Sequence, residues 1–374
     1  MSRGVLKAGL GFILALSACG TTTAADVPGT DATTTPATTT AAPTTETETP
    51  IDGAGGEGGS DGGNGAGAGP VIDCWDNTYQ GDAPVPDYAS LEPNVGDHCL
   101  GTDHQTIESV ERIVFLGDSI TVGTPPTAAR NYYRAELAAR LANRFDLEPP
   151  GLTWRVPNPV TRMASQIEDG AFASCARWGA RAADVVDDQL DLCFESSDFN
   201  ARTLVVITVG GNDMQDATAL ALDGAEESAV AARVDAMIAA QTAAVEWLTA
   251  PGRFPRGVFA IAANVYEFTD GTGTWDGCDV SPLVGFDKPL PAPELILNHI
   301  RRANLASMRT AVDTQTDIVF AHEHFCGHGF QAANPEAPCY RGAGVDRWFD
   351  LTCIHPNRRG HEELATMFEA VVAE

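Results

Sequence analysis

Short apolar runs alternate with longer amphipathic segments through residues 110–374 of the chain. The apolar runs, which have the length of strands, are residues 112–116, 203–209, 257–263 and 317–321. The segments with helical composition and spacing are residues 127–145, 226–249, 294–312 and 358–372. Near-continuous apolar strands separated by helices are typical of a parallel sheet covered on both faces. The pattern therefore predicts an α/β protein, a three-layer α/β/α sandwich with a central parallel sheet.

Polar motifs follow the predicted strands, where the ligand site of such a sheet lies. The sequence Gly-Asp-Ser, residues 117–119, follows the first strand, and Gly-Gly-Asn-Asp, residues 210–213, follows the second. His355 comes just before the last predicted helix. These junctions lie on one side of the sheet, so we expect Ser119, Asn212 and His355 to lie near one another.

The chemistry of these side chains points to acyl transfer. A serine hydroxyl is a poor nucleophile at neutral pH and needs a base within hydrogen-bond reach, and His355 is the strong candidate for that base. When Ser119 attacks an ester carbonyl, the carbonyl oxygen becomes an oxyanion that needs hydrogen-bond donors. The reaction needs no cofactor, and the sequence predicts none and no metal.

Four blocks of sequence occur in the order typical of one enzyme family. They are residues 115–123, 175–184, 210–213 and 355–357, the last followed by Gly360. Together they resemble the conserved blocks of the GDSL or SGNH hydrolases over residues 110–374. The resemblance implies a flavodoxin-like SGNH hydrolase fold and a serine esterase or lipase.

The same resemblance implies a role for individual residues. Ser119 matches the nucleophile of the first block, and His355 matches the base of the last. Gly179 and Asn212 match the glycine and asparagine of the second and third blocks. The implied oxyanion hole is the backbone N–H of Ser119, the backbone N–H of Gly179 and the side-chain amide of Asn212.

The third member of a catalytic triad departs from the family pattern. An aspartate commonly lies three residues before the histidine, and here that position is Thr352. Asp350 could curve round to reach the imidazole of His355. Alternatively, a backbone carbonyl orients the ring and Asp350 is only solvated. The sequence leaves both open.

The sequence does not decide which class of ester is the natural substrate. A lipase or general esterase acting on a lipid or short-chain ester is favoured, with residues 266–293 and 323–347 expected to decide between them. The alternatives are a carbohydrate O-acetyl esterase, an acyltransferase with the same residues, and a surface lipoprotein that binds a glycan or partner without turnover. We expect a monomer.

The first residues have the form of an export signal. Arg3 and Lys7 precede a short apolar run, residues 9–16, that is too short to span a bilayer. Leu-Ser-Ala-Cys, ending at Cys19, resembles the lipobox of bacterial lipoproteins, in which the cysteine becomes the acylated N-terminus. With Gly20 next, the resemblance implies the outer membrane or cell surface, with the lipid as the only membrane attachment. The alternative is a plain signal peptide cleaved near residues 24–25.

Composition divides the rest of the chain and excludes nucleic acid as a partner. Residues 1–18 are predicted as the lipoprotein signal peptide and residues 19–70, rich in Thr, Ala, Pro and Gly, as a disordered acidic tether. Residues 71–374 form the predicted hydrolase domain. Nucleic-acid phosphates are bound by a basic surface, and a chain with a net charge of −28 is not expected to have one.

Eight cysteines remain after Cys19, an even number in a chain expected to be exported. They are Cys74, Cys99, Cys175, Cys193, Cys278, Cys326, Cys339 and Cys353. In an oxidising compartment they predict up to four disulfides. Pairing neighbours gives 74–99, 175–193 and 326–339 as a hypothesis, which leaves 278 and 353. The alternative is a metal site at His-Glu-His-Phe-Cys-Gly-His, residues 322–328, whose spacing matches no common structural zinc pattern.

Overall fold

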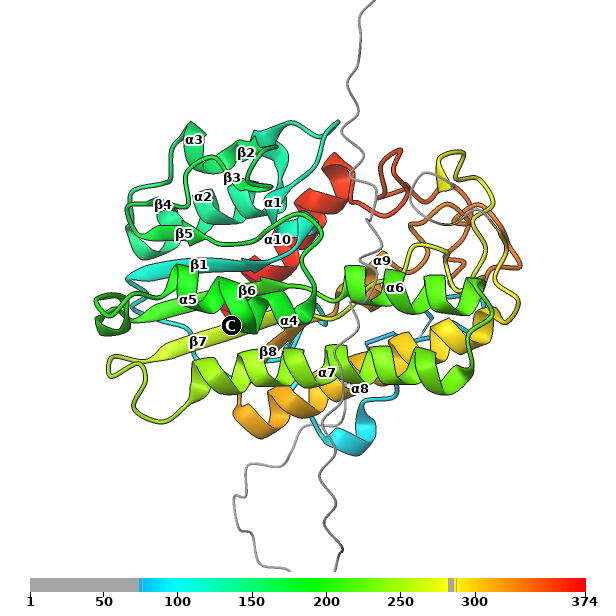
Figure 1. Ribbon diagram of the computed structural model, residues 1–374, viewed down its shortest axis with the longest axis horizontal. Coiled ribbons are helices and arrows are strands. Elements are labelled where there is room, and N and C mark those ends of the chain that lie inside the picture. Colours follow the sequence, from blue (N-terminus) through cyan, green and yellow to red (C-terminus); the bar gives the residue numbers. More distant parts are fainter. Residues whose placement is uncertain (1–73, 76, 282–285, 287) are drawn as a thin grey trace, which may run out of the picture. The chain divides into compact units, whose positions relative to one another are not determined.

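A mixed sheet lies between two layers of helices in the computed structural model (Figure 1). The structure describes residues 74–75, 77–281, 286 and 288–374. The predictions for the signal peptide, for Cys19 and for the tether fall outside these residues. The predicted three-layer α/β/α architecture is confirmed for the described part of the chain.

The strands of the sheet follow the order β4-β5-β1-β6-β7-β8. Their bounds are β1 Arg112–Gly117, β4 Glu168–Asp169, β5 Phe172–Ser174, β6 Thr203–Thr208, β7 Val258–Ala263 and β8 Asp317–Val319. All neighbours pair in parallel except β4, which pairs antiparallel with β5. The sheet is therefore mixed rather than purely parallel. The strands β4 and β5 are too short to leave an apolar period in the sequence.

Helices cover both faces of this sheet (Figure 1). On one face lie α4 Ala182–Asp184, α5 Leu190–Cys193, α6 Gly211–Leu222, α7 Glu227–Thr249 and α8 Pro293–Thr314. On the other lie α2 Tyr133–Phe145, α3 Leu152–Arg155, α9 Ala321–Phe325 and α10 Arg358–Ala373, and α1 Ser119–Val122 begins where β1 ends. Among the described residues, no helix combines the length and apolarity needed to cross a membrane.

The packing of β1 explains why this strand is a nearly continuous apolar run in the sequence. Every residue of β1 is buried. Ile113 and Phe115 pack toward α2 and α10, whereas Val114 and Leu116 pack toward α7 and α8. Because alternate side chains enter two different cores, the positions from Ile113 to Leu116 are apolar on both faces of the strand.

Smaller elements connect these layers. They are η1 Ala89–Leu91, η2 Ala129–Asn131, η3 Val185–Gln189, η4 Asp198–Asn200, β2 Pro157–Asn158 and β3 Met163–Ala164. The segment 127–145, expected as one helix, divides at Tyr132 into η2 and α2. Tyr132 has an extended backbone with ψ of 140°, which interrupts the helix at that point.

All eight cysteines of the described region form disulfides. The pairs are Cys74–Cys99, Cys175–Cys193, Cys278–Cys353 and Cys326–Cys339. The three neighbouring pairs and the remaining long-range pair are those of the sequence hypothesis, which is confirmed. The last pair links positions 75 residues apart.

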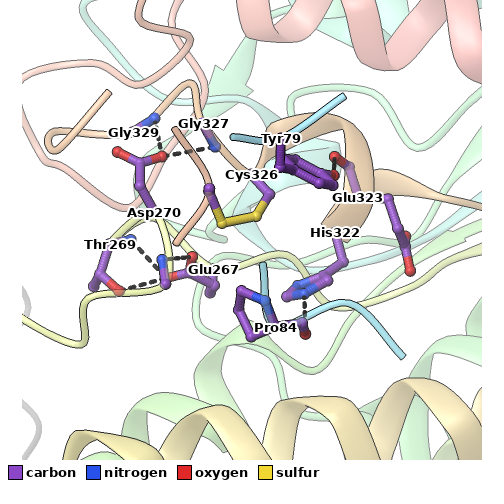
Figure 2. The surroundings of a disulfide bond; sticks show 12 residues. Tyr79, Pro84, Glu267, Thr269, Asp270, His322, Glu323, Cys326, Gly327 and Gly329 are labelled. Atoms are coloured by element: carbon purple, nitrogen blue, oxygen red, sulfur yellow. Dashed lines mark hydrogen bonds between the residues drawn. A yellow bond between two sulfur atoms is a disulfide. The ribbon is translucent and has the colours of Figure 1, made fainter. Parts of the chain in front are cut away.

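The segment considered as a metal site is instead tied to its surroundings by a disulfide and by hydrogen bonds (Figure 2). Cys326 is bonded to Cys339, and the His322 ring contacts the carbonyl of Pro84 through Nε2 at 3.2 Å. The buried carboxylate of Asp270 accepts hydrogen bonds from the backbone N–H of Gly327 and of Gly329. A cysteine in a disulfide has no thiolate to offer a metal.

Residues 77–105, here called the lead-in segment, reach the outer edge of the sheet beside β8 through residues 101–105. Gly101 forms an antiparallel bridge with Val319, and the Thr102 hydroxyl donates to the Asp317 carboxylate at 2.9 Å. The Gln105 amide also donates to Asp317, at 2.7 Å. The lead-in segment therefore covers an edge that would otherwise offer unpaired backbone groups.

Candidate active site

Ser119 is the first residue of α1, directly after the central strand β1. Asp118 caps this helix, because its Oδ1 accepts a hydrogen bond from the backbone N–H of Ile120 at 2.9 Å. Gly117 has a φ of +132°, and a side chain there would meet the Thr208 carbonyl oxygen. The Gln189 amide brackets Gly117, accepting from its N–H at 2.7 Å and donating to its carbonyl at 2.8 Å. The turn is thus fixed on both sides, with Ser119 at its tip.

His355 lies in hydrogen-bond contact with the serine. Its Nε2 is 2.9 Å from Ser119 Oγ. Burial lowers the pKa of His355 to about 4, so the ring is neutral at neutral pH. A neutral imidazole with a bare Nε2 can accept the hydroxyl proton of Ser119.

The loop before α10 holds His355 at three points. The backbone N–H of Asp350 donates to the His355 carbonyl at 2.9 Å. The hydroxyl of Tyr266 donates to the carbonyl of Ile354 at 2.9 Å. The disulfide between Cys278 and Cys353 joins the loop to the region after β7. Two of these contacts come from the region after β7, so the position of the ring depends on tertiary structure.

The other ring nitrogen of His355 contacts a residue to which sequence reasoning gave no role. The Thr352 hydroxyl lies 2.9 Å from Nδ1, and it donates to Asp350 Oδ1 at 2.6 Å. Among the described residues, neither the Asp350 carboxylate nor a backbone carbonyl makes a hydrogen bond to Nδ1. Asp350 is therefore one hydrogen bond away from the ring. The signal for this arrangement is Asp-x-Thr, a spacing at which the aspartate accepts from residue i+2.

The three groups expected in the oxyanion hole are placed by the turn after β1 and by α6. Within the described residues, no hydrogen bond engages the backbone N–H of Ser119 or of Gly179. Gly179 has a φ of +76°, and a Cβ there would lie 2.4 Å from the guanidinium of Arg162. Asn212 Nδ2 donates to the Ala180 carbonyl at 2.9 Å, which leaves one of its two hydrogens for another acceptor.

Asn212 and its neighbour Asp213 together fix the segment that contains Gly179. Asp213 Oδ2 accepts from the backbone N–H of Ala182 at 2.9 Å, and Asp213 is buried. The guanidinium of Arg233 lies 3.7 Å from the same carboxylate. The motif after β6 is thus more than a turn, because two adjacent side chains position residues 179–182 against α6.

A large cavity opens beside the serine and histidine. Ser119, Asn212 and His355 all line it, and its volume is about 1060 Å³ including the open mouth. Most of the lining is apolar and comes from α6, from α8 and from the loop after β7: Met214, Val265, Phe268, Trp275, Phe286, Leu290, Ile296, Leu297 and Ile300. Gly179 is not among the described residues that line the cavity.

Aromatic rings form one wall of this cavity. Trp275 and Phe286 stack with ring centroids 4.3 Å apart, and Phe268 stacks on Trp275 at 5.9 Å. Described residues of the loop 266–293 thus line the cavity, as the sequence suggested for a specificity loop, whereas among the described residues 323–347 none lines it. Of the tryptophans, Trp154 is fully buried in the core. The core and the cavity wall both favour aromatic side chains, so the residue type alone does not distinguish them.

The fold and the site together define an α/β ester hydrolase of the esterase or lipase type. The chain belongs to the GDSL-like lipase/acylhydrolase family, whose family model matches residues 115–363. This confirms the resemblance drawn from the sequence blocks. No curated protein matches the chain in sequence.

Several solved structures are similar to this chain at low sequence identity. Phospholipase A1 from Streptomyces albidoflavus NA297 shares 17% identity, with a TM-score of 0.43 over 70% of this chain and 99% of that one. A GDSL-like lipase from Parabacteroides merdae shares 14%, with a TM-score of 0.41 over 72% and 99%. The lipase Lip_vut3 from a goat rumen metagenome shares 13%, with a TM-score of 0.44 over 70% and 96%.

Proposed function

We propose that this enzyme hydrolyses carboxylic esters with an apolar acyl chain, through an acyl-enzyme intermediate on Ser119. The observation that carries the proposal is the Ser119–His355 hydrogen bond at the wall of a largely apolar cavity. A nucleophile and its base meet there beside a space suited to a hydrocarbon chain.

The first half of the reaction forms the acyl-enzyme. Ser119 Oγ attacks the ester carbonyl carbon while His355 Nε2 takes its proton. The carbonyl oxygen gains a negative charge, which the N–H of Ser119 and the amide of Asn212 at the cavity wall stabilise, with the N–H of Gly179 as the third donor that the family resemblance implies. His355 then passes the proton to the leaving alcohol as the carbon–oxygen bond breaks.

The second half of the reaction releases the acid. Water takes the place of the alcohol and loses a proton to His355 as its oxygen attacks the acyl carbon. The same donors stabilise the second oxyanion. The bond to Ser119 Oγ breaks, the proton returns from His355 to the serine, and the free enzyme is restored.

The lining of the cavity favours acyl chains longer than acetyl. Each methylene moved from water into apolar surroundings contributes about 0.8 kcal/mol. An acetyl group has no methylene to bury and gains little from this cavity. The preference for lipase or general esterase activity over removal of acetyl groups from glycans follows from this difference.

The proposal predicts a rise in kcat/KM with acyl length. With p-nitrophenyl acetate, butyrate and octanoate, we expect kcat/KM of the full chain to be at least about tenfold higher for octanoate than for acetate. Replacing Leu297 of α8 by tryptophan narrows the cavity, so the Leu297→Trp variant is expected to lower the octanoate-to-acetate ratio by about tenfold.

The matched control is Leu305→Trp, two turns further along α8 and packed against a different cluster beside Phe320. It should leave the ratio unchanged. If acetate is the best of the three substrates and the Leu297→Trp variant keeps the wild-type ratio, the cavity does not bind the acyl chain. An O-acetyl esterase would then be the better description.

We also propose that the enzyme acts outside the cytoplasm, held to the cell envelope by acyl chains on Cys19. The disulfides of the described region support an oxidising compartment. The lipobox-like sequence ending at Cys19 supports acylation. More than one acyl chain would anchor the protein stably, because a single chain gives only marginal binding.

Metabolic labelling tests the anchor. In a bacterial host that processes lipoproteins, an alkyne fatty acid is expected to label the wild-type protein and not the Cys19→Ser variant. The wild type should fractionate with membranes. An unlabelled wild-type protein in the soluble fraction, cleaved near residues 24–25, would indicate a plain signal peptide.

A further inference from the structure

A hydroxyl group occupies the position between His355 and the buried carboxylate of Asp350. Thr352 Oγ1 is 2.9 Å from His355 Nδ1 and 2.6 Å from Asp350 Oδ1. A hydroxyl has one hydrogen to donate and two lone pairs to accept with. With one hydrogen and two partners, the hydroxyl can donate to only one of them and must accept from the other, so the contacts have a direction.

The charge of Asp350 decides this direction. An ionised carboxylate can only accept, so the hydroxyl hydrogen of Thr352 points to Asp350. The lone pair that remains can then accept from Nδ1–H of His355. The ring is thereby held with its proton on Nδ1 and with Nε2 bare, facing the Ser119 hydroxyl at 2.9 Å. The reverse direction would place the ring proton on Nε2 and remove the base.

Burial and local contacts act in opposite directions on the ionisation of Asp350. Asp350 is 5% exposed, and burial raises the pKa of its carboxyl group. The two hydrogen bonds from Thr352 and the positive charge of Arg347 oppose that rise in pKa. Both hydrogen bonds from Thr352 end on Oδ1, the backbone N–H at 2.8 Å and the hydroxyl at 2.6 Å.

The contact with the ring goes beyond what the turn requires. An aspartate turn of this kind is closed by the backbone N–H of Thr352 alone. The hydroxyl contact with His355 Nδ1 adds nothing to the turn, yet it supplies the acceptor that a neutral Nδ1–H needs in a buried site.

We propose that Thr352 is a positioning residue whose hydroxyl links the Asp350 carboxylate to His355 Nδ1 and holds the ring in the tautomer that activates Ser119. The proposal rests on the hydrolytic mechanism given above. It replaces direct contact between aspartate and histidine by a contact through threonine.

Substitutions at both positions test the link by kinetics. The Thr352→Val variant keeps the shape but removes the hydroxyl, and it is expected to lower kcat by about 10- to 100-fold with KM changed less than about twofold. Thr352→Ser restores the hydroxyl and should lie within about threefold of the wild type. Asp350→Asn keeps a turn-forming side chain without the charge and should lower kcat by about tenfold.

The double variant shows whether Asp350 acts through Thr352 or whether the two residues act independently. If Asp350 acts through Thr352, the Asp350→Asn/Thr352→Val variant should have the kcat of Thr352→Val within about twofold. If the fold-loss of kcat in the double variant equals the product of the two single-variant losses, the proposal is overturned. A Thr352→Val variant with wild-type kcat would overturn it as well. Thermal unfolding of each variant identifies any that fails to fold.

A spectroscopic measurement keeps the link testable without turnover. In the full chain labelled with ¹⁵N-histidine, the ring ¹⁵N shifts of His355 are expected to show a protonated Nδ1 in the wild type and mixed tautomers in Thr352→Val. A wild-type ring protonated on Nε2 would overturn the link even if esters are hydrolysed. A protonated Nδ1 that depends on Thr352, in a protein that cleaves no ester, would support the link and overturn the proposed function.

Discussion

Replacing Ser119 by alanine is expected to lower kcat for p-nitrophenyl ester hydrolysis by about a millionfold, the largest effect of any single change. The hydroxyl that His355 Nε2 contacts at 2.9 Å is lost, and no acyl-enzyme can form. His355→Ala should cost about as much, and the double variant no more than either. Serine and histidine act as one unit, so their losses do not add. The measurement is the initial rate across a range of enzyme concentrations.

A matched serine elsewhere in the chain provides the control for that result. Ser307 lies on α8, and its hydroxyl donates to the Ala303 carbonyl at 3.1 Å. Ser307→Ala should keep wild-type kcat, and both alanine variants should unfold at the wild-type temperature. If Ser119→Ala retains more than about one per cent of the activity while folded, Ser119 is not the nucleophile.

Removing the disulfide between Cys278 and Cys353 is expected to lower both stability and activity. The disulfide joins residues 75 apart. Without it the unfolded chain gains conformational entropy, which lowers the free energy of unfolding by about 4.5 kcal/mol at 25 °C. The Cys353 end lies two residues from His355, so kcat should fall as well. The variant is Cys278→Ala/Cys353→Ala, and the measurements are denaturant unfolding without reductant and ester hydrolysis.

The Cys74–Cys99 disulfide separates the two effects. It joins residues 25 apart, and its loss should cost about 3.5 kcal/mol. Because it lies in the N-terminal part of the described chain, Cys74→Ala/Cys99→Ala should keep wild-type kcat under conditions where the variant is folded. Unchanged kcat in the Cys278→Ala/Cys353→Ala variant would mean that the contacts of Tyr266 and Asp350 suffice to hold His355.

The sequence predicts those parts of the fold in which a single strand or helix leaves a recognisable pattern in its own residues. Strand β1 is buried on both faces and reads as an unbroken apolar run, so its end and the position of Ser119 could be found from sequence. The disulfides between neighbours were predictable for a similar reason, because a short separation restricts the choice of partner. The single long-range pair then followed by elimination.

The parts that escaped prediction depend on contacts between distant segments. Helix α6 begins within the Gly-Gly-Asn-Asp motif, and the sequence pattern predicted no helix there, because glycine and asparagine favour turns. The relation of Thr352 to His355 depends on how the loop before α10 closes, with the N–H of Asp350 on the His355 carbonyl. The cavity is lined by side chains from many separate segments of the chain, and no local sequence pattern shows that these segments come together.

The lead-in segment has a consequence for the order in which the chain can fold. Thr102 and Gln105 are synthesised early, yet their partner Asp317 lies 215 and 212 residues later. Contacts of such separation form slowly, because a long loop must close before they contribute. The first part of the described domain to leave the ribosome is therefore among the last to reach its final place, and the edge of the sheet at β8 is covered only when nearly the whole chain has been made.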